Sequence, residues 1–459
     1  PKVYRYSCYY WLPVAFLLIS FSLQKGIVSR LLSNRILGIG GEISYSFYLI
    51  HLFVLLSYAE WQKGSNFHIA WYISIPILFC IIVLLSLLSY YYFEKPMNKR
   101  IMEQLSNKNP RIEVVDALRG FAVMAILLVH SLEHFIFPVY PTDSPTWLNI
   151  LDQGVLSGTF TLLAGKSYAI FALLFGFTFY IQSNNQKKQG KDFGYRFLWR
   201  LVLLAAFATL NAAFFPAGDV LLLFVIVGLV LFFTRNWSDK AILITSIIFL
   251  LQPVEWYHYI ASLINPAHQL PDLKVGEMYA EVAEYTQAGN FWDFIWGNVT
   301  LGQKASLLWA VNAGRFFQTA GLFLLGFYIG RKQLFVTTEK NLHFWIKILI
   351  ISAISFAPLY ALKELIMQNS TIIQQTAGTA FDMWQKLAFT FVLVASFVLL
   401  YQREKFSKAV SSLRFYGKMS LTNYISQSII GALIYFPIGL YLAPYCGYTL
   451  SLLIGFCMF

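Results

Sequence analysis

One short stretch of the chain places ionisable side chains inside an apolar run. The stretch is RIEVVDALRGFAVMAILLVHSLEHF, residues 111–135, and it contains Asp116, Arg119 and His130. Ionisable residues inside a membrane span are costly and are therefore candidates for function. Because the unshifted pKa of histidine suits proton transfer near neutral pH, we predict that His130 is a general base. A buried histidine that is hydrogen-bonded for packing is the alternative.

The spacing of these residues sets their relative heights on a helix. Asp116 and Arg119 lie three residues apart, so they share a face and can form an ion pair near the cytoplasmic end. His130 follows Asp116 by fourteen residues, which is nearly four turns and about 21 Å. Asp116 and His130 therefore point to similar sides, with His130 in the outer half of the membrane. We predict that Asp116 orients Arg119.

Two more ionisable residues follow His130 directly. Glu133 and His134 complete HSLEH, which has the spacing of an inverted zinc-protease motif. This i, i+3, i+4 geometry suits a metal, but no third-ligand motif appears downstream, and we predict no metal site. The preferred interpretation is a Glu133–His134 pair at the outer mouth that tunes the surroundings of His130.

Four further charged residues stand at or within apolar runs. Arg196 and Arg200 share a helix face near the cytoplasmic end, where paired guanidinium groups suit a phosphate-bearing ligand such as coenzyme A. An ordinary basic anchor at the membrane edge is the alternative. Arg315 lies well inside an apolar run and must meet a carboxylate or a cavity. Asp219 occupies a tight outer hairpin, and we predict that it faces the same cavity as His130.

The composition excludes a soluble protein. Of the 459 residues, 58% are hydrophobic and 12% are charged, whereas soluble domains carry about 25% charged residues. Apolar runs near the roughly 20 residues of a spanning helix recur along the chain. We therefore predict an all-α polytopic integral membrane protein whose partner is the lipid bilayer. The net charge of +12 fits basic cytoplasmic loops, and no basic domain predicts nucleic-acid binding.

We predict about thirteen transmembrane helices, three before and ten after a polar, basic segment. The spans cover residues 7–23, 43–61, 69–93, 114–137, 164–182, 197–215, 220–233, 241–264, 307–330, 344–367, 380–401, 420–442 and a truncated 448–459. Loops 184–196, 234–240, 331–341 and 402–418 are basic, and the large loop 265–306 is acidic. The positive-inside rule therefore places the basic loops and the linker in the cytoplasm.

The same pattern predicts two domains joined by a cytoplasmic linker. The first covers residues 1–100, the linker 101–113, and the second 114–459. We expect the chain to be a fragment, because it lacks an initiator Met and its last apolar run is too short to span.

One helix-opening signature occurs twice. GEISYSFYLIH, residues 41–51, and GKMSLTNYISQ, residues 417–427, share a glycine, a serine, a second hydroxyl residue and a tyrosine in step. Two interpretations stay open: a packing face of small and hydroxyl residues, or the lining of a site. Gln427 lies two turns into its helix, where an uncharged polar group needs a partner, and we predict that it contacts substrate.

Several motifs together resemble a known superfamily. VVDALRGFAVMAILLVH resembles the first helix of the membrane acyltransferase superfamily. Residues 111–459, with SYAIFALLFGF, GDVLLLFVIVGL, FLLGFYIGRKQLF and GKMSLTNYISQS, look like the YeiB-like family (domain of unknown function 418) within it. Residues 1–100, with LGIGGEISYSFYLIH and YYYFEKPMNKR, resemble the C-terminal helices of the acyltransferase-3 family. The resemblance implies a multi-pass protein of the bacterial plasma (inner) membrane.

The resemblance also implies an activity. An acyl group, usually acetyl, passes from cytoplasmic acyl-CoA, a co-substrate rather than a permanently bound cofactor, to a hydroxyl or amine of a sugar or glycan acceptor. His130 takes the place of the superfamily's catalytic histidine, and Asp116 and Arg119 match its cytoplasmic-end motif. YeiB-like proteins more often have Asn at the position of His130. At this position the chain resembles the acyltransferase-3 family instead.

These arguments assign a role to each candidate residue, with one alternative function. The predicted catalytic residues are His130, Asp116 and Glu133; the predicted acyl-CoA ligands are Arg119, Arg196 and Arg200; the predicted substrate contacts are His134, Asp219, Arg315 and Gln427. The alternative is a proton-coupled transporter or exporter of a small molecule. A transporter of this kind should show inverted repeats with broken helices, whereas the sequence shows only a repeated same-sense motif.

Overall fold

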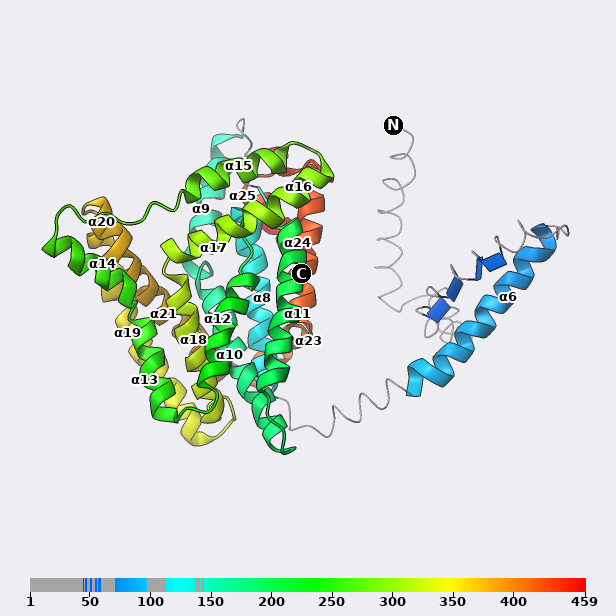
Figure 1. Ribbon diagram of the computed structural model, residues 1–459, viewed down its shortest axis with the longest axis horizontal. Helices are drawn as coiled ribbons and strands as arrows, with labels where there is room; N and C mark the ends of the chain where they lie inside the picture. The colour runs from blue at the N-terminus through cyan, green and yellow to red at the C-terminus, as the bar shows by residue number, and fades with distance from the viewer. Residues whose placement is uncertain are drawn as a thin grey trace. The chain divides into compact units, whose positions relative to one another are not determined.

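The computed structural model describes residues 71–96, 112–136, 141 and 144–459, together with single positions between 44 and 58. The chain divides into two compact units, Pro1–Pro110 and Arg111–Phe459, here called unit 1 and unit 2 (Figure 1). In unit 1 the described helix α6, Trp71–Ser89, runs on into the π-helical turn η1, Tyr90–Glu94. The predicted span 7–23 and most of the predicted linker lie outside the described residues.

Every regular element that the structure describes is a helix, so the predicted all-α class is confirmed. Six helical segments in this part of the chain are long and apolar enough to cross a membrane, and a bent pair makes a seventh. They are Ser74–Tyr92, Glu113–Glu133, Thr146–Lys187, Gly194–Phe214, Glu339–Ile366 and Thr371–Tyr401, with Asp239–Leu250 plus Pro253–Ile264 as the bent pair. The apolar helices indicate a multi-pass membrane protein, while the total of about thirteen spans stays a prediction.

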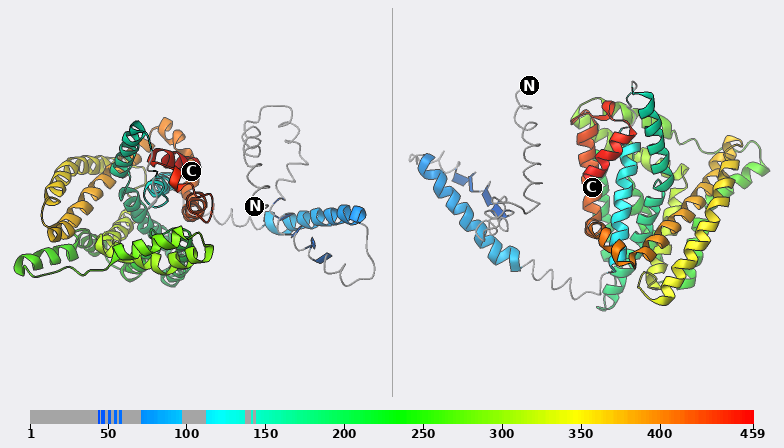
Figure 2. Two further views of the ribbon diagram at one scale, coloured as in Figure 1. Left: turned by 90° about the horizontal axis from the view of Figure 1, so that it is seen from above. Right: turned by 180° about the vertical axis from the view of Figure 1, so that it is seen from behind.

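Unit 2 is built around α8, Glu113–Glu133, the span with the largest buried share. The elements that follow are α9 Thr146–Leu162, α10 Lys166–Lys187, α11 Gly194–Phe214, α12 Leu221–Thr234, α13 Asp239–Leu250, α14 Pro253–Ile264, α15 Val275–Gln287, α16 Phe291–Gly297, η2 Asn298–Gly302, α17 Gln303–Asn312 and α18 Arg315–Arg331. The last third contains α19 Glu339–Ile366, α20 Thr371–Ile373, η3 Gln374–Gly378, α21 Thr379–Tyr401, α22 Glu404–Ala409, α23 Ser411–Lys418, α24 Ser420–Tyr435, η4 Ala443–Tyr445 and α25 Tyr448–Met458. Seen from behind in Figure 2, α19 runs beside α21 at one edge of unit 2.

Reciprocal glycine contacts bring α8 and α23 to backbone distance. A Cβ on Gly120 of α8 would collide with the backbone of Leu413 in α23, and one on Gly417 would collide with the carbonyl oxygen of Asp116. Small residues at membrane helix interfaces allow this close approach. The glycine that opens the signature GKMSLTNYISQ therefore packs against the glycine of DALRG, which favours the packing interpretation of that signature.

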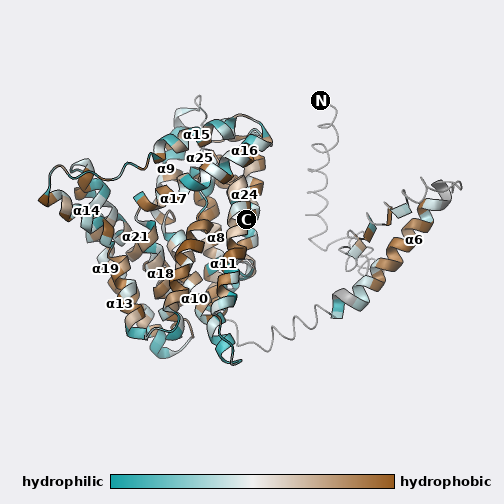
Figure 3. Ribbon diagram, in the orientation of Figure 1, coloured by the Kyte–Doolittle hydropathy of each residue, from teal (hydrophilic) through white to brown (hydrophobic). Residues whose placement is uncertain are grey.

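Ion pairs join three of the loops predicted to be cytoplasmic. Arg235 lies 3.7 Å from Asp192 of the preceding loop, and Asp239 lies 2.8 Å from Arg331 of a third loop. Hydrophilic residues gather at this end of unit 2 (Figure 3). The three loops therefore share one end of the helix bundle, as the predicted alternation of loops requires.

Two predicted spans are broken, and one predicted outer loop contains a helix. The predicted span 241–264 bends by 47° between α13 and α14, where Gln252 has φ +61°. The predicted span 307–330 breaks between α17 and α18 at Gly314, with φ +63°. A left-handed residue cannot continue a right-handed helix, so each break follows from the backbone. The predicted outer loop 138–163 contains α9, which ends just before Gly165.

The large acidic loop, residues 265–306, is also largely helical. It holds α15, α16 and η2, and the first turns of α17. The side chain of Asn290 caps α16 by accepting a hydrogen bond from the backbone N–H of Trp292. The segment still connects two predicted spans, and its side of the membrane stays a prediction. The buried Val282 gives α15 an apolar face, which explains why this connection is helical.

Candidate active site

A cavity of about 390 Å³ lies inside unit 2, a size typical of small-molecule sites. Its walls come from α8, α10, the hairpin between α11 and α12, the helix α15, and the α17–α18 break. Five residues that the sequence singled out line it together. They are His130, Glu133, His134, Asp219 and Arg315.

The imidazole of His130 has an unusual environment for a buried side chain. Its ring centroid lies 4.5 Å from that of Phe215 and 5.2 Å from that of His134. Both ring nitrogens are buried, and neither has a hydrogen-bond partner within the described chain. Buried polar atoms are nearly always hydrogen-bonded, so two unused nitrogens beside a cavity are noteworthy. The packing alternative needs a protein partner, and these residues supply none.

Glu133 and His134 stand beside His130 at the wall of the cavity. The Nε2 atom of His134 lies 3.8 Å from a carboxylate oxygen of Glu133, as the predicted pair requires. Within the described ranges, no group of three or more His, Cys, Asp or Glu side chains is arranged to hold a metal ion. Glu133 also acts on α15, because burial and the Glu133 charge raise the pKa of the Tyr279 phenol.

Asp219 is fixed by several donors at the start of α12. Its carboxylate accepts hydrogen bonds from the side chain of Asn211 (2.9 Å) and from the backbone N–H groups of Leu221 (3.2 Å) and Leu222 (3.3 Å). Bonds to backbone N–H groups of a first turn are those of a helix cap. Asp219 is 3% exposed, and burial raises the pKa of its carboxyl to about 7. This hairpin residue therefore exchanges a proton near neutral pH.

Arg315 is the first residue of α18 and follows the break at Gly314. Its Nη1 atom donates a hydrogen bond of 2.8 Å to Gln318, and its guanidinium carbon lies 4.8 Å from the ring centroid of Tyr168. The sequence required a carboxylate or a cavity for this charge. The structure provides the cavity, with a neutral amide and an aromatic ring as neighbours.

The arginines predicted to bind acyl-CoA lie elsewhere. Arg119 pairs with Asp116 at 3.0 Å, as predicted, and donates a hydrogen bond of 2.9 Å to Thr178. Because α8 is unbroken, Asp116 lies about 21 Å and Arg119 about 17 Å along the helix from His130. Arg200 is within electrostatic range of Arg119, and Arg196 bonds to Gln186 on the surface. None of these side chains lines the cavity.

Gln427 does not line the cavity either. It is buried and bonds to the hydroxyl of Tyr416. Its neighbour Tyr424, one turn earlier, comes closer, with its ring centroid 6.2 Å from that of His130. Sequence reasoning missed Tyr424 and Tyr168, although the shared tyrosine of the two signatures was a usable signal for the first.

The apolar helices indicate a multi-pass α-helical membrane protein, and its cavity is lined by apolar and polar side chains together. Residues 329–459 match the model of a family described as "Protein of unknown function (DUF418)". This finding agrees with part of the resemblance noted for residues 111–459. The resemblance of residues 1–100 to acyltransferase-3 proteins stays a prediction.

Two relatives from Bacillus share sequence with the chain. "Uncharacterized protein YxaH" of Bacillus subtilis (strain 168) is 24% identical over 359 residues, which are 72% of this chain and 83% of that protein. "Uncharacterized 39.9 kDa protein in amylase 3'region" of Bacillus acidopullulyticus is 28% identical over 141 residues, covering 31% of this chain and 39% of that protein. No solved structure matches the chain.

Proposed function

We propose that unit 2 is a membrane acyltransferase that moves an acyl group, in the simplest case acetyl, from cytoplasmic acyl-CoA to a hydroxyl or amine of a sugar-containing acceptor. The observation that carries the proposal is His130, whose two buried nitrogens have no partner in the described chain and whose side chain lines the cavity. A general base must be free to accept a proton where the acceptor binds.

In this mechanism His130 removes the proton of the acceptor hydroxyl as its oxygen attacks the thioester carbonyl carbon. The carbon–sulfur bond then breaks, and the imidazolium returns the proton to the leaving sulfur of coenzyme A. The products are the acyl ester and the free thiol, so atoms and charge balance. His134 and Glu133, 3.8 Å apart, set the electrostatic surroundings of the transient imidazolium.

The donor has to reach His130 from the opposite end of α8. Arg119 and Arg200 lie near one another at the end predicted to be cytoplasmic, where guanidinium groups suit the phosphates of coenzyme A. The distance along α8 from Arg119 to His130 is about 17 Å. An extended arm of the donor therefore carries the thioester along the helix, while the nucleotide stays at the membrane surface.

The proposal is tested with purified protein, labelled acetyl-CoA and a panel of sugar and glycan acceptors. We expect coenzyme A binding and acyl transfer in the wild type, and a loss of transfer of about 10²-fold or more in His130→Ala. His343→Ala is the matched control, because His343 is an exposed histidine on α19 that does not line the cavity. Absence of both coenzyme A binding and transfer with every acceptor would sink the enzyme assignment.

One observation supports a second candidate, a proton-coupled transporter. Two predicted spans are broken beside buried polar residues: Gln252 at the α13–α14 bend and Arg315 after the α17–α18 break. Broken helices of this kind form the substrate sites of many transporters. Proteoliposomes decide between the two: uptake of a solute driven by a pH gradient and lost in His130→Ala favours transport, whereas label transfer without uptake favours the acyltransferase.

A further inference from the structure

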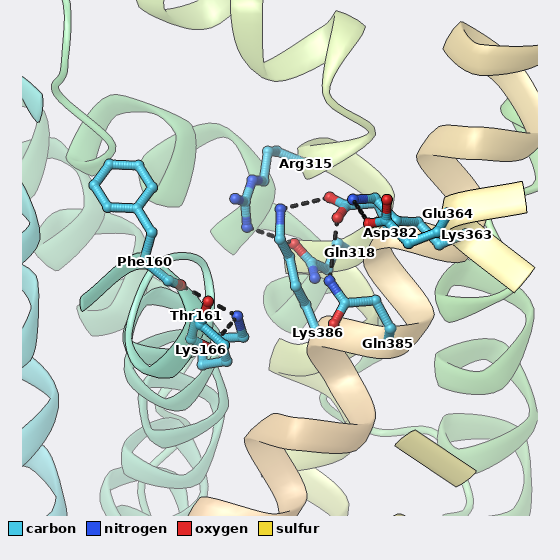
Figure 4. Close-up of polar contacts among 10 residues, drawn as sticks. All are labelled: Phe160, Thr161, Lys166, Arg315, Gln318, Lys363, Glu364, Asp382, Gln385 and Lys386. Atoms are coloured by element: carbon cyan, nitrogen blue, oxygen red, sulfur yellow. Dashed lines mark hydrogen bonds and ion pairs between the residues drawn. The ribbon is translucent and has the colours of Figure 1, made fainter. Parts of the chain in front are cut away.

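Cationic side chains gather where α10, α18, α19 and α21 come together (Figure 4), and one of them, Arg315, lines the cavity. The four are Lys166, Arg315, Lys363 and Lys386. Lys386 pairs with Asp382 at 2.5 Å, and Lys363 pairs with Glu364 at 2.9 Å. No carboxylate in the described chain lies within 4.0 Å of Lys166 or Arg315. Lys166 and Arg315 are thus left without an ion-pair partner in the described chain, and of the carboxylates only Asp382 acts on Lys166, from farther away.

Both of these cations are buried, and their partners are neutral. Lys166 is 4% exposed, and its ammonium donates a hydrogen bond of 2.8 Å to the carbonyl oxygen of Thr161. Arg315 is 8% exposed and bonds to the Gln318 amide at 2.8 Å. Neutral acceptors satisfy donors but do not balance charge, and a buried charge without a counter-ion is costly.

Two of the four cationic side chains lie against one glycine of the cavity wall. A Cβ on Gly165 would lie 3.3 Å from the Nη2 atom of Arg315 and 3.0 Å from the Cδ atom of Lys386. Gly165 itself lines the cavity and directly precedes Lys166. Glu255 faces Gly314 and makes no ion pair with Arg315 among the described residues. The positive charge therefore borders the cavity.

The position of the two cations in their helices adds to this imbalance. Lys166 is the first residue of α10, and Arg315 is the first residue of α18. A helix N-terminus carries a partial positive charge, so a cation there is unfavourable, whereas an anion is favoured. Two positive helix ends, each beginning with a buried cation, are electrostatically unfavourable unless an anion lies between or beside them.

We propose that this end of the cavity is a subsite for a phosphate group, held by Arg315 and Lys166 with Lys386 behind Gly165. A guanidinium group can donate two parallel hydrogen bonds to a phosphate, and an ammonium group adds a compact positive charge. A phosphate dianion balances the two cations that lack carboxylates. Because His130 and Arg315 line one cavity, the acceptor is then a phosphate-bearing molecule; this last step rests on the proposed function.

The test measures thermal unfolding of the purified protein against inorganic phosphate, with acetate at equal ionic strength as the comparison. Phosphate is expected to raise the unfolding temperature of the wild type more than acetate does. Arg315→Gln and Lys166→Gln are each expected to weaken apparent phosphate binding about tenfold or more. Arg403→Gln and Lys304→Gln, both exposed positions, are matched controls that keep the wild-type response.

The unliganded variants separate a binding role from a structural one. Removing a buried cation that lacks a counter-charge leaves the unfolding temperature of phosphate-free Arg315→Gln unchanged or higher. A phosphate response that persists in both variants overturns the proposal. If Arg315→Gln does not fold, Arg315→Lys keeps the charge, loses the fork, and is expected to show the intermediate affinity.

Two further arms identify the source of the phosphate. Glycerol 3-phosphate tests a soluble ester, and nanodiscs with or without phosphatidic acid test a lipid head group; the probe whose effect is lost in Arg315→Gln is the favoured source.

Saturating coenzyme A should leave phosphate binding unchanged, and displacement would assign the subsite to the donor instead. Phosphate binding that follows Arg315 without any acyl transfer retains the subsite and refutes only the acyltransferase. Acyl transfer that depends on His130, together with phosphate binding that does not depend on Arg315, retains the acyltransferase and refutes only the subsite.

Discussion

Asp219 and His130 line one cavity but stand in opposite hydrogen-bonding environments. The Asp219 carboxylate accepts three hydrogen bonds, whereas the His130 nitrogens have no partner in the described chain. The first residue is held in place by its neighbours, and the second is left for a ligand. The positions of Asp116 and Arg119 could be predicted because a pair three residues apart on a helix needs no tertiary information. The proximity of Tyr424 to His130 could not, because it depends on how α24 packs against α8.

Asp219 gives a pH prediction at the scale of one residue. Burial raises the pKa of its carboxyl to about 7 in the folded protein, while the unfolded chain releases this proton near pH 4. The contribution of this proton to the free energy of unfolding is therefore fully present below about pH 4 and is lost as pH rises through about 7. Asp219→Asn has no titrating carboxyl at this position. The unfolding temperature of this variant should therefore change less than that of the wild type between pH 5 and about pH 8.

The measurement is thermal unfolding at several pH values in one detergent. Asp272→Asn is the control, since Asp272 is an exposed carboxylate in the segment before α15. Parallel pH profiles for the wild type and Asp219→Asn would contradict the raised pKa.

At the scale of elements, the close contact between α8 and α23 explains two sequence motifs at once. DALRG and GKMS each provide a glycine whose missing Cβ lets the other helix approach to backbone distance. The existence of both helices could be predicted from apolar runs. The bend between α13 and α14 could not, because Gln252 adopts a left-handed conformation that glutamine rarely takes and that no local signal announces.

This contact predicts a large effect from a single methyl group. In Gly417→Ala the added Cβ would collide with the carbonyl oxygen of Asp116, a backbone atom that cannot rotate away. Overpacking of this kind typically costs about 1–3 kcal/mol of unfolding free energy. Gly158→Ala is the matched control, because nothing lies within 4 Å of its position on α9. Thermal unfolding should show a clear decrease for the first variant alone, and equal behaviour of the two would refute the close contact.

At the scale of the whole molecule, the predicted orientation of unit 2 can be tested directly. Positive loops stay on the cytoplasmic side, so Gln189→Cys, in a basic loop, should react with an impermeant thiol reagent only in opened cells or inside-out vesicles. Glu281→Cys, on an exposed face of α15, should react in intact cells. Both variants are made in a cysteine-free background. Labelling from the opposite sides would reverse the orientation and place the cavity mouth in the cytoplasm.

The crossing of α10 and α18 has a mechanical consequence for the far end of both helices. Gly176 and Gly326 each meet the backbone of the other helix, at Phe323 and Leu173, so the two helices are clamped at one point. Lys166 and Arg315 lie ten and eleven residues from this fulcrum, which is a lever arm of about 15 Å. A tilt of about 5° at the crossing displaces the tip of such an arm by about 1.3 Å. The distance between Lys166 and Arg315 therefore depends on two glycines, Gly176 and Gly326, which lie far from any ligand that the two cations would bind.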